Sequence, residues 1–400
     1  MHYHILGLGS VGCLLAHNLR RILPSTHATI TLVHKTRLNE LALQEKGSIQ
    51  VQDAFGAVTT SAGFLSEEFQ DANQSSQEEE GGPAQDLEPI QSLFVALKAQ
   101  HTVSALKTLT YRLSANSTIV LMQNGMGIHE ELIRNVFRNP SKRPHFILAS
   151  NTNGAFTTKP FHVIHAGVGS IDFAIAPESQ GREFEAGFHD ETVPHSQRRP
   201  RLSDITWPTD VDAARYISLR NTVAALLLLE PLSTSWKPYA ELQLIMRRKL
   251  VVNAVLNPLT ALMGCRNGEL SRLPSTSRTM RMICWEASLV YAAEMRREST
   301  FLLEDMQSEG VDTKDVTLPY LPKCLTPECL EEEVVRVTQL TKNNVSSMLQ
   351  DVRRGKTTEI DYINGYLINL GRELGIRTPV NSVLYDLIKM RYRIPLDQML

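Results

Sequence analysis

The sequence has few cysteines, and their arrangement supports neither a disulfide framework nor a metal site. They are Cys13, Cys265, Cys284, Cys324 and Cys329, an odd number without a CxxC pair. The histidines do not cluster at the spacing of metal ligands either. We therefore expect free thiols in a reducing compartment and no bound metal ion.

Positive charge is not in excess, and long apolar runs are lacking. The chain has 41 Lys and Arg against 43 Asp and Glu, which argues against nucleic acid or an anionic membrane as a partner. The longest apolar run, in VAALLLLEPL, has about 7 residues before its first charge, whereas roughly 20 are needed to cross a bilayer. The opening residues MHYHILGLG do not resemble a targeting signal. These features predict a cytoplasmic protein without nucleic-acid or membrane partners.

The order of strand-like and helical patterns predicts two domains. In the first half, strand-like runs alternate with helical patterns, which is typical of an α/β, Rossmann-type doubly wound sheet. We expect this domain over residues 1–220, finished by a hairpin of FHVIHAG and GSIDFAIA. From Ser233 onward the patterns are helical, so an all-α domain is expected over residues 235–400.

Two polar segments interrupt the first domain. Residues 66–88 contain eight acidic residues and no Lys or Arg, and residues 178–210 are polar, mixed in charge and rich in proline. Such segments bury too little apolar surface to offset the entropy of ordering. Both are predicted to be solvated, disordered insertions.

The hexapeptide GLGSVG places Gly7, Gly9 and Gly12 in the GxGxxG spacing between a predicted strand and a predicted helix. Gly7 permits a tight turn, Gly9 lets a pyrophosphate approach the backbone, and Gly12 lets helix and strand pack closely. The motif alone is weak, but the strand and helix around it are the context that it requires. We therefore predict dinucleotide binding over residues 7–12.

The second strand, ITLVHKTR, favours NADPH over NADH. NAD-binding proteins usually end this strand with an acidic residue that binds the ribose 2′-hydroxyl, whereas His34, Lys35 and Arg37 offer positive charge to a 2′-phosphate. The alternative is a solvated basic loop. Lys98 in VALKAQ and Asn124 in VLMQNGMG follow later strands, where open parallel sheets bind ligands, although a surface lysine and a turn asparagine would look the same.

A polar stripe lies in the helical half of the chain. Lys249, Asn253 and Asn257 are spaced i, i+4, i+8, so they share one face of a helix. Pro258 disfavours helix at Asn257, which predicts that this asparagine lies at the end of the helix, where it can reach a cleft. The alternative is a set of capping or core amides with Lys249 extending to solvent.

A second helical stretch, NNVSSMLQDVRRGKTTEIDYINGY, carries Ser347 and Glu359. Gly355 is expected to stop one helix and Thr357 or Thr358 to cap the next, so that Glu359 falls in a first turn. By themselves, Glu359 fits a partner for the helix dipole and Ser347 a surface hydroxyl.

Taken together, GLGSVG, LKAQ, QNGMG, KLVVNAVLNPLTAL, NGEL and NNVSSMLQDVRRGKTTEIDYING resemble the ketopantoate reductase (2-dehydropantoate 2-reductase) family. The resemblance runs in order over most of the chain, and the last two groups are its most specific part. It implies an N-terminal Rossmann domain, an all-helical C-terminal domain, and reduction of a 2-keto acid by NADPH in the cleft between them. The implied place of this reaction is the biosynthesis of pantothenate and coenzyme A.

The resemblance also assigns roles to residues. The catalytic residues that it implies are Lys249 and Glu359. The implied contacts to the substrate are Asn124, Asn253, Asn257, Asn267, Asn344 and Ser347. The implied contacts to the cofactor are Gly7, Leu8, Gly9, Ser10, Val11, Gly12, Lys98, Asn124, Ala155 and Glu359. Asn153 departs from the family, where histidine is frequent, and the two insertions make the chain longer than short members.

The implied chemistry accounts for the polar stripe. Negative charge develops on the carbonyl oxygen of the keto acid during reduction and must be met by a proton, which Lys249 can donate if burial weakens its basicity. Glu359 would orient Lys249, and neutral donors would bind the carboxylate and hydroxyl of the substrate. Two alternatives remain: a reductase of another branched 2-keto acid, and an NADPH-binding sensor without catalysis. The sequence leaves open whether the protein is a monomer or a homodimer.

Overall fold

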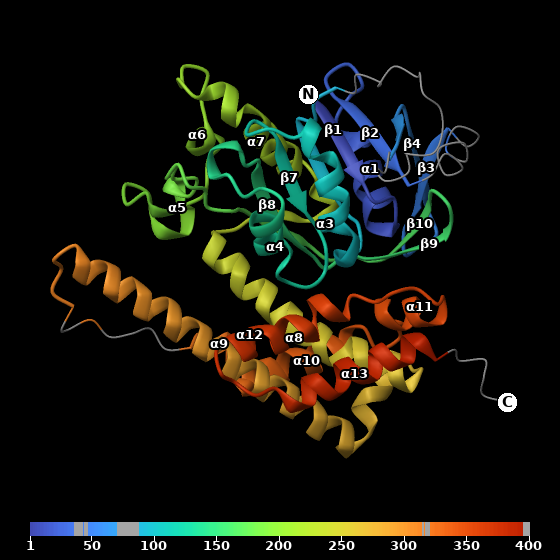
Figure 1. The fold of residues 1–400 in the computed structure, drawn as a ribbon. Helices are drawn as coiled ribbons and strands as arrows, with labels where there is room; N and C mark the ends of the chain where they lie inside the picture. The colour runs from blue at the N-terminus through green and yellow to red at the C-terminus, as the bar shows by residue number, and fades with distance from the viewer. Residues whose placement is uncertain (36–42, 44–46, 70–87, 314–315, 317–320, 395–400) are drawn as a thin grey trace, which may run out of the picture. The chain divides into compact units, whose positions relative to one another are not determined.

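The computed structural model describes residues 1–35, 43, 47–69, 88–313, 316 and 321–394 (Figure 1). The chain forms two compact units. The first comprises Met1–Gln123 and Ile128–Leu242, and the second comprises Asn124–Gly127 and Gln243–Leu400. The division therefore falls inside a helix at Leu242, rather than between residues 220 and 235.

An eight-stranded sheet forms the centre of the first unit, in the order β12-β11-β8-β7-β6-β1-β2-β5. Six strands from β8 to β5 run parallel, while β11 and β12 run antiparallel to β8. The strands are β1 (His2–Leu6), β2 (Thr29–His34), β5 (Leu65–Glu68), β6 (Ser92–Val95), β7 (Thr118–Leu121), β8 (His145–Asn151), β11 (Ile171–Ile175) and β12 (Thr234–Trp236). The central strands are buried on both faces, which explains their nearly continuous apolar sequences. The predicted doubly wound Rossmann-type sheet is confirmed.

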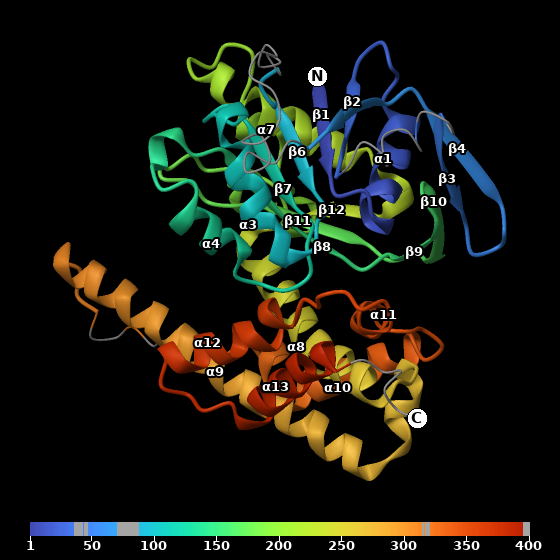
Figure 2. The ribbon, with the colours of Figure 1, turned by 45° about the vertical axis from the view of Figure 1, so that its right-hand side comes forward.

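Helices cover this sheet on both faces, as Figures 1 and 2 show. The longer ones are α1 (Ser10–Ile22), α3 (Ala99–Thr108), α4 (Ile128–Asn135) and α7 (Ala213–Leu227), and short 3-10 turns are η1 (Leu109–Arg112), η2 (Pro140–Lys142) and η4 (Glu230–Leu232). Helix α7 packs on β6, β7 and β12, while α3 packs against α4. Helix α1 contacts β1 and β2 on one side and a second sheet on the other (Figure 2).

The second sheet has the order β4-β3-β10-β9 and is formed by β3 (Ser48–Gln52), β4 (Val58–Ala62), β9 (Gly154–Lys159) and β10 (His162–Gly167). The predicted hairpin of FHVIHAG with GSIDFAIA is wrong, because β10 pairs antiparallel with β9 while β11 joins the large sheet. Only Pro160 and Phe161 connect β9 to β10, and Phe161 adopts a left-handed φ of 59°. This tight turn pairs β10 with the preceding strand instead of the following one.

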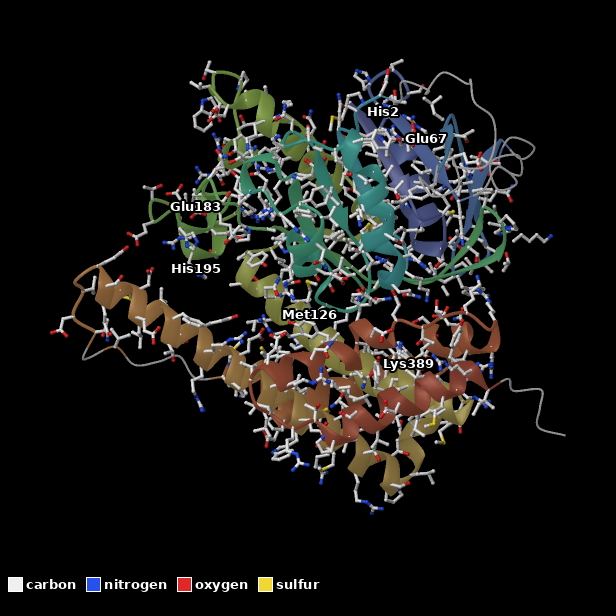
Figure 3. The ribbon with its side chains drawn as sticks, in the orientation of Figure 1. His2, Glu67, Met126, Glu183, His195 and Lys389 are labelled. Atoms are coloured by element: carbon white, nitrogen blue, oxygen red, sulfur yellow. The ribbon has the colours of Figure 1, made fainter. Side chains whose placement is uncertain are left out.

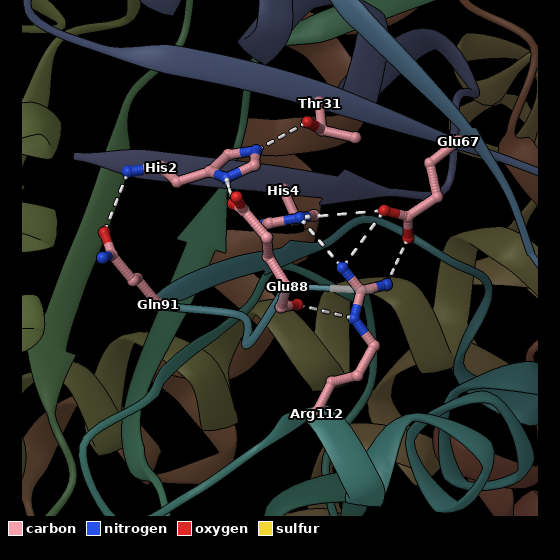
Figure 4. A network of polar contacts seen from close by, with 7 residues as sticks. All are labelled: His2, His4, Thr31, Glu67, Glu88, Gln91 and Arg112. Carbon is pink, nitrogen blue, oxygen red and sulfur yellow. Dashed lines mark hydrogen bonds and ion pairs between the residues drawn. The ribbon is translucent and has the colours of Figure 1, made fainter. Parts of the chain in front are cut away.

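Arg112 fixes the chain on both sides of residues 70–87, which lie outside the described residues. Its guanidinium donates to the two carboxylate oxygens of Glu67 at 2.5 and 3.1 Å, and its Nε donates to the carbonyl oxygen of Glu88 at 3.0 Å (Figure 4). The carboxylate of Glu88 lies 3.5 Å from Nδ1 of His2, whose ring stacks on that of His4. Residues 66–68 are part of β5, which pairs with β2. The predicted disordered insertion is therefore wrong for these residues.

Residues 178–210 are ordered, contrary to the prediction from their composition. They contain α5 (Ala186–His189), η3 (His195–Gln197) and α6 (Leu202–Ile205), and they bury Phe184 and Ile205. Arg182 lies 2.6 Å from Asp210 and 4.0 Å above the ring of Tyr216 in α7. Two pairs of opposite charge, Arg182 with Asp210 and Arg201 with Asp190, thus form within this segment, which a count of polar residues does not reveal.

The second unit is helical, as predicted. It contains α8 (Tyr239–Met263), whose first residues belong to the first unit, and α9 (Pro274–Ser308), α10 (Pro327–Leu340), α11 (Ser347–Arg353), α12 (Asn364–Glu373) and α13 (Pro379–Arg393), with 3-10 turns η5 (Asn267–Arg272), η6 (Lys323–Leu325) and η7 (Ile360–Tyr362). Its core is built around α8, where Val251, Val255 and Leu256 are buried. Met126, labelled in Figure 3, also joins this core. Among the described residues, none of the helices combines the length and apolar character that crossing a membrane requires.

Candidate functional site

Three neighbouring parallel strands bring the predicted cofactor residues to one edge of the large sheet. Strand β1 lies between β2 and β6, and it pairs with both in parallel register. The glycine turn follows β1, Lys35 follows β2, and Lys98 comes shortly after β6. The carboxyl edge of a parallel sheet is where α/β folds bind nucleotides.

The glycine turn has the shape that a pyrophosphate requires. Gly7 has a φ of +100°, and a Cβ there would lie 2.6 Å from the backbone of Ala96. A Cβ on Gly12 would lie 2.0 Å from the carbonyl oxygen of Gly7, whereas a Cβ on Gly9 would meet nothing within 4 Å. Gly7 and Gly12 are thus required by packing, and Gly9 leaves space over the backbone where a ligand can approach.

Helix α1 begins directly after this turn and adds a positive electrostatic field. Gly9 is its N-cap residue, Ser10 and Val11 are its first residues, and its first turn contains no acidic side chain. The N–H groups of a first helical turn lack partners within the helix, and they point toward the helix N-terminus. The turn therefore fits the phosphates of a dinucleotide.

A cluster of basic side chains lies beside this edge. Lys35 is exposed, and Lys98 is half-buried at the N-cap position of α3. Burial lowers the pKa of His101, and the charges of Lys35 and Lys98 lower it further. The two lysines and His101 are therefore close enough to interact electrostatically. Sequence reasoning missed His101, and Arg37 lies outside the described residues.

His34 does not provide the positive charge that the sequence predicted. Its side chain is buried at the end of β2, where Nε2 lies 3.2 Å from the hydroxyl of Ser66 and the ring meets Phe161 edge-on. Burial lowers the pKa of His34 to about 4, so the ring is neutral at physiological pH. Pairing of β5 with β2 encloses this residue, and the sequence pattern of β2 alone does not show that pairing.

Asn124 starts a four-residue loop that is packed within the second unit. The backbone N–H of Met126 donates to the carbonyl oxygen of Tyr362 at 3.0 Å, and a Cβ on Gly125 would lie 2.4 Å from the same oxygen. Gly125 also has a φ of +89°. Both the close contact and this left-handed backbone conformation therefore require glycine. The loop fixes the half-buried Asn124 two residues before Met126.

Ala155 and Asn153 lie in and beside β9 of the first unit. Ala155 is half-buried and packs on the core of that unit. The Oδ1 atom of Asn153 accepts from the backbone N–H of Gly169 and lies 3.0 Å from Nε2 of His165. Asn153 therefore stabilises a turn, which gives a structural reason for asparagine at this position.

Lys249 and Glu359 interact electrostatically within the second unit. Burial lowers the pKa of Lys249 from 10.5 to about 8, and the charge of Glu359 acts in the opposite direction. Lys249 and Asn253 are half-buried on α8, and Asn257 and Glu359 are buried. The structure thus brings the two predicted catalytic residues together and keeps the polar stripe on one helix.

Helix α8 does not end at Asn257 as predicted, because it continues through Pro258 to Met263. Proline lacks the N–H that would bond the carbonyl of Ala254. That carbonyl instead accepts a hydrogen bond from the side chain of Asn364 at 3.0 Å. A donor from another helix therefore compensates for the proline, and nothing in the local sequence signals it.

The other predicted substrate residues surround the start of α11. The backbone N–H of Asn267 donates to the carbonyl oxygen of Asn344 at 3.1 Å, which brings these two residues together. Asn344 and Ser347 are exposed, and Ser347 is the first residue of α11. Ser346 caps this helix and accepts a hydrogen bond of 2.7 Å from Thr260 of α8. Sequence reasoning missed both Ser346 and Thr260.

Glu359 occupies a different local structure from the one predicted. It immediately precedes the 3-10 turn η7, and α12 starts only at Asn364. The predicted cap at Thr357 or Thr358, with Glu359 in the first turn of an α-helix, is therefore wrong. Glu359 is 5% exposed, so burial beside Lys249, rather than the dipole of a long helix, characterises its environment.

Comparison with known proteins identifies the family of the chain. The family model described as ketopantoate reductase PanE/ApbA matches residues 3–178, and the model of its C-terminal part matches residues 241–392. A probable 2-dehydropantoate 2-reductase of Schizosaccharomyces pombe is 28% identical, with coverage of 97% of this chain and 95% of that protein. The 2-dehydropantoate 2-reductase of Yersinia pestis is 30% identical, with coverage of 75% and 73%.

A solved structure shares the fold over almost the whole length. D-mandelate dehydrogenase, in a ternary structure with NADH and anilino(oxo)acetate, has a TM-score of 0.66 and 16% identity, with coverage of 98% of this chain and 99% of that one. At this identity the similarity concerns the fold alone. On the family models and relatives together, the chain belongs to the ketopantoate reductase family of nicotinamide-dependent oxidoreductases.

Proposed function

We propose that this protein reduces 2-dehydropantoate to (R)-pantoate with NADPH, a step in the biosynthesis of pantothenate and coenzyme A. The observation that carries the proposal is the electrostatic interaction of Lys249, whose pKa is lowered, with the buried Glu359. Lys249 lies on helix α8, which also carries Asn253 and Asn257. The names of the two relatives support the choice of substrate.

The first unit is proposed to hold the cofactor. The open space over Gly9 and the start of α1 suit the pyrophosphate. Lys35 and Lys98 suit a 2′-phosphate, because a charge-assisted contact forms only with the phosphorylated cofactor. Ala155 of this unit and Asn124 of the second unit are proposed as further contacts, on the resemblance to the family. His34 is neutral and is not included in this proposal.

Lys249 is proposed as the proton donor. When bound, the reduced nicotinamide supplies a hydride to the carbonyl carbon of the substrate. The ammonium of Lys249 then donates its proton to the carbonyl oxygen, which becomes the hydroxyl of the product, and the lysine regains a proton from solvent before the next turnover. Burial makes the ammonium a better acid, and Glu359 keeps enough of it protonated near neutral pH.

Neutral side chains of the second unit are proposed to bind the substrate. Asn253 and Asn257 lie on the same face of α8 as Lys249, while Asn267, Asn344 and Ser347 lie around the start of α11. Amides and hydroxyls can bind a carboxylate or a hydroxyl by hydrogen bonds. They do so without adding a further charge beside Lys249 and Glu359.

Consumption of NADPH by the purified protein tests the proposal. Rapid consumption with 2-dehydropantoate, and slow consumption with other branched 2-keto acids and with NADH, is the expected result. Higher kcat/KM with another keto acid would identify a related reductase. Tight binding of NADPH without turnover of any keto acid would identify a sensor, and both results contradict the proposal.

A further inference from the structure

We propose that Asn364 is a positioning residue, which supplies the hydrogen-bond donor that Pro258 withholds from α8 and thereby holds Glu359 beside Lys249. This inference rests on the proposed function, since the position of Glu359 affects turnover only if Lys249 donates the proton. It concerns a residue that lies outside the set of predicted substrate and cofactor contacts.

Pro258 creates the requirement for an external donor. In an α-helix the N–H of residue 258 would bond the carbonyl of Ala254, but proline has none. Ala254 is fully buried, so water does not replace the missing donor, and an unpaired buried carbonyl destabilises a fold. The Nδ2 atom of Asn364, itself fully buried, lies 3.0 Å from this oxygen.

The amide of Asn364 is held in one orientation by groups that can only accept. Its second N–H donates to Oδ1 of Asn381 at 3.0 Å. The Nδ2 atom of Asn381 donates in turn to the carboxylate of Glu286 at 2.7 Å, and the backbone N–H groups of Val380 and Asn381 donate to the same carboxylate. A carbonyl at one end and a carboxylate at the other fix both amides.

This chain of bonds connects the two elements that carry the proposed catalytic pair. Asn364 is the first residue of α12, and only η7 and Ile363 separate it from Glu359. Ala254 lies on α8 little more than one turn after Lys249. The bond from Asn364 to Ala254 therefore fixes the segment of Glu359 against the part of α8 that presents Lys249.

Replacing Asn364 with alanine is expected to disturb catalysis in a specific way. Loss of the bond lets Glu359 move relative to Lys249, and a misplacement of about 1 Å in an active site can lower turnover by about 10²-fold. We expect kcat to fall by about 10- to 100-fold, with a smaller change in KM for NADPH. Because the charge of Glu359 raises the pKa of Lys249, the basic limb of the pH profile of kcat should move to lower pH.

Pro258→Ala provides the decisive comparison, since it returns an N–H donor to the carbonyl of Ala254. We expect the effect of Asn364→Ala on kcat and on Tm to be smaller in the Pro258→Ala background than in the wild-type background. Compensation should be partial, because Oδ1 of Asn381 still loses the hydrogen bond that Asn364 donates to it. If Asn364→Ala alone does not fold, the double variant should fold, and failure of both to fold would contradict the proposal.

Leu325→Ala serves as a matched control. Leu325 is fully buried in η6 of the same unit, so its truncation should lower Tm and leave the basic limb in place. An unchanged limb in Asn364→Ala, or equal effects of Asn364→Ala in both backgrounds, would refute the role of Asn364. Failure of the proposed function looks different: the wild-type protein would then lack a basic limb that depends on Lys249.

Discussion

Replacement of Lys249 with methionine should abolish most turnover and leave the fold at least as stable. Methionine keeps the length and apolar stem of the side chain but removes the amine. A positioned general acid contributes about 10²- to 10⁴-fold to rate, so we expect kcat to fall by that factor. The basic limb in the pH profile of the wild-type protein, expected near the pKa of about 8, should disappear.

The stability effect follows from the same pKa. A change from 10.5 to about 8 corresponds to about 3 kcal/mol by which the fold disfavours the ammonium relative to the amine. The side chain is only half-buried, so contact with water reduces this to about 1–2 kcal/mol. Between pH 8 and 10.5 the unfolded chain binds the proton more tightly than the folded one, so stability rises with pH in this window. Below it, the cost of the charge is present in full.

At pH 7, Lys249→Met should therefore unfold at a higher temperature than the wild type, by about 2–4 °C for each kcal/mol. Steady-state kinetics and thermal unfolding of the same preparations measure both effects. Lys237→Ala is the matched control, because Lys237 lies in a partly exposed pair with Glu241 and its loss should change neither property. Near wild-type turnover of Lys249→Met would refute the role as acid, and a lower Tm near pH 7 would refute the reasoning about burial.

Four further predictions concern other parts of the protein. Lys35→Ala should raise KM for NADPH much more than KM for NADH, and equal effects on the two cofactors in steady-state assays would argue against a contact with the 2′-phosphate. Asn253→Ala should raise KM for the keto acid before it lowers kcat, because a neutral donor also contributes in the ground state; a fall in kcat alone would contradict this. Deletion of residues 70–87 with a short Gly/Ser bridge should preserve Tm and kcat, since Arg112 holds both flanks. Arg112→Ala should destabilise the fold by about 3 kcal/mol in denaturant titrations, because the carboxylate of Glu67 would then have only the neutral ring of His4 beside it.

Much of the fold could be predicted because its signals are local. Strands β6 and β7 are short apolar runs, and they end shortly before Lys98 and Asn124, where the sequence predicts strands. Lys98 could be placed at the carboxyl edge of the sheet from its position after β6, since the topology of a parallel sheet places all such positions together. The spacing of Lys249, Asn253 and Asn257 likewise gave their shared helix face.

The errors have a common physical origin in contacts between residues distant in the chain. The sequence predicts a positive charge at His34, but β5 encloses this side chain and burial lowers its pKa. Residues 178–210 looked solvated because composition does not show that Arg182 pairs with Asp210 and packs on Tyr216. Propensity and pattern describe a residue and its near neighbours, whereas burial and pairing depend on the whole unit.

Pro258 is the clearest case. Its local effect is to remove a hydrogen bond, and the sequence therefore predicts the end of a helix. The helix continues because Asn364, more than a hundred residues later, supplies the missing donor. Whether the helix continues can therefore be predicted only when Pro258 and Asn364 are considered together.

Helix α8 also needs polar contacts because most of its buried side chains are apolar. Apolar side chains surround it on most sides, and apolar packing alone is non-directional, so it specifies the rotation and register of a helix weakly. Three contacts at intervals along α8 add direction. Arg247 pairs with Glu294 of α9 at 3.1 Å, the carbonyl of Ala254 accepts from Asn364 of α12, and Thr260 donates to Ser346, the N-cap residue of α11. A rotation or slip of α8 would break all three at once and leave buried polar groups unpaired. The same orientation directs Lys249 toward Glu359, so the polar contacts that specify the register of the helix also keep the proposed proton donor in place.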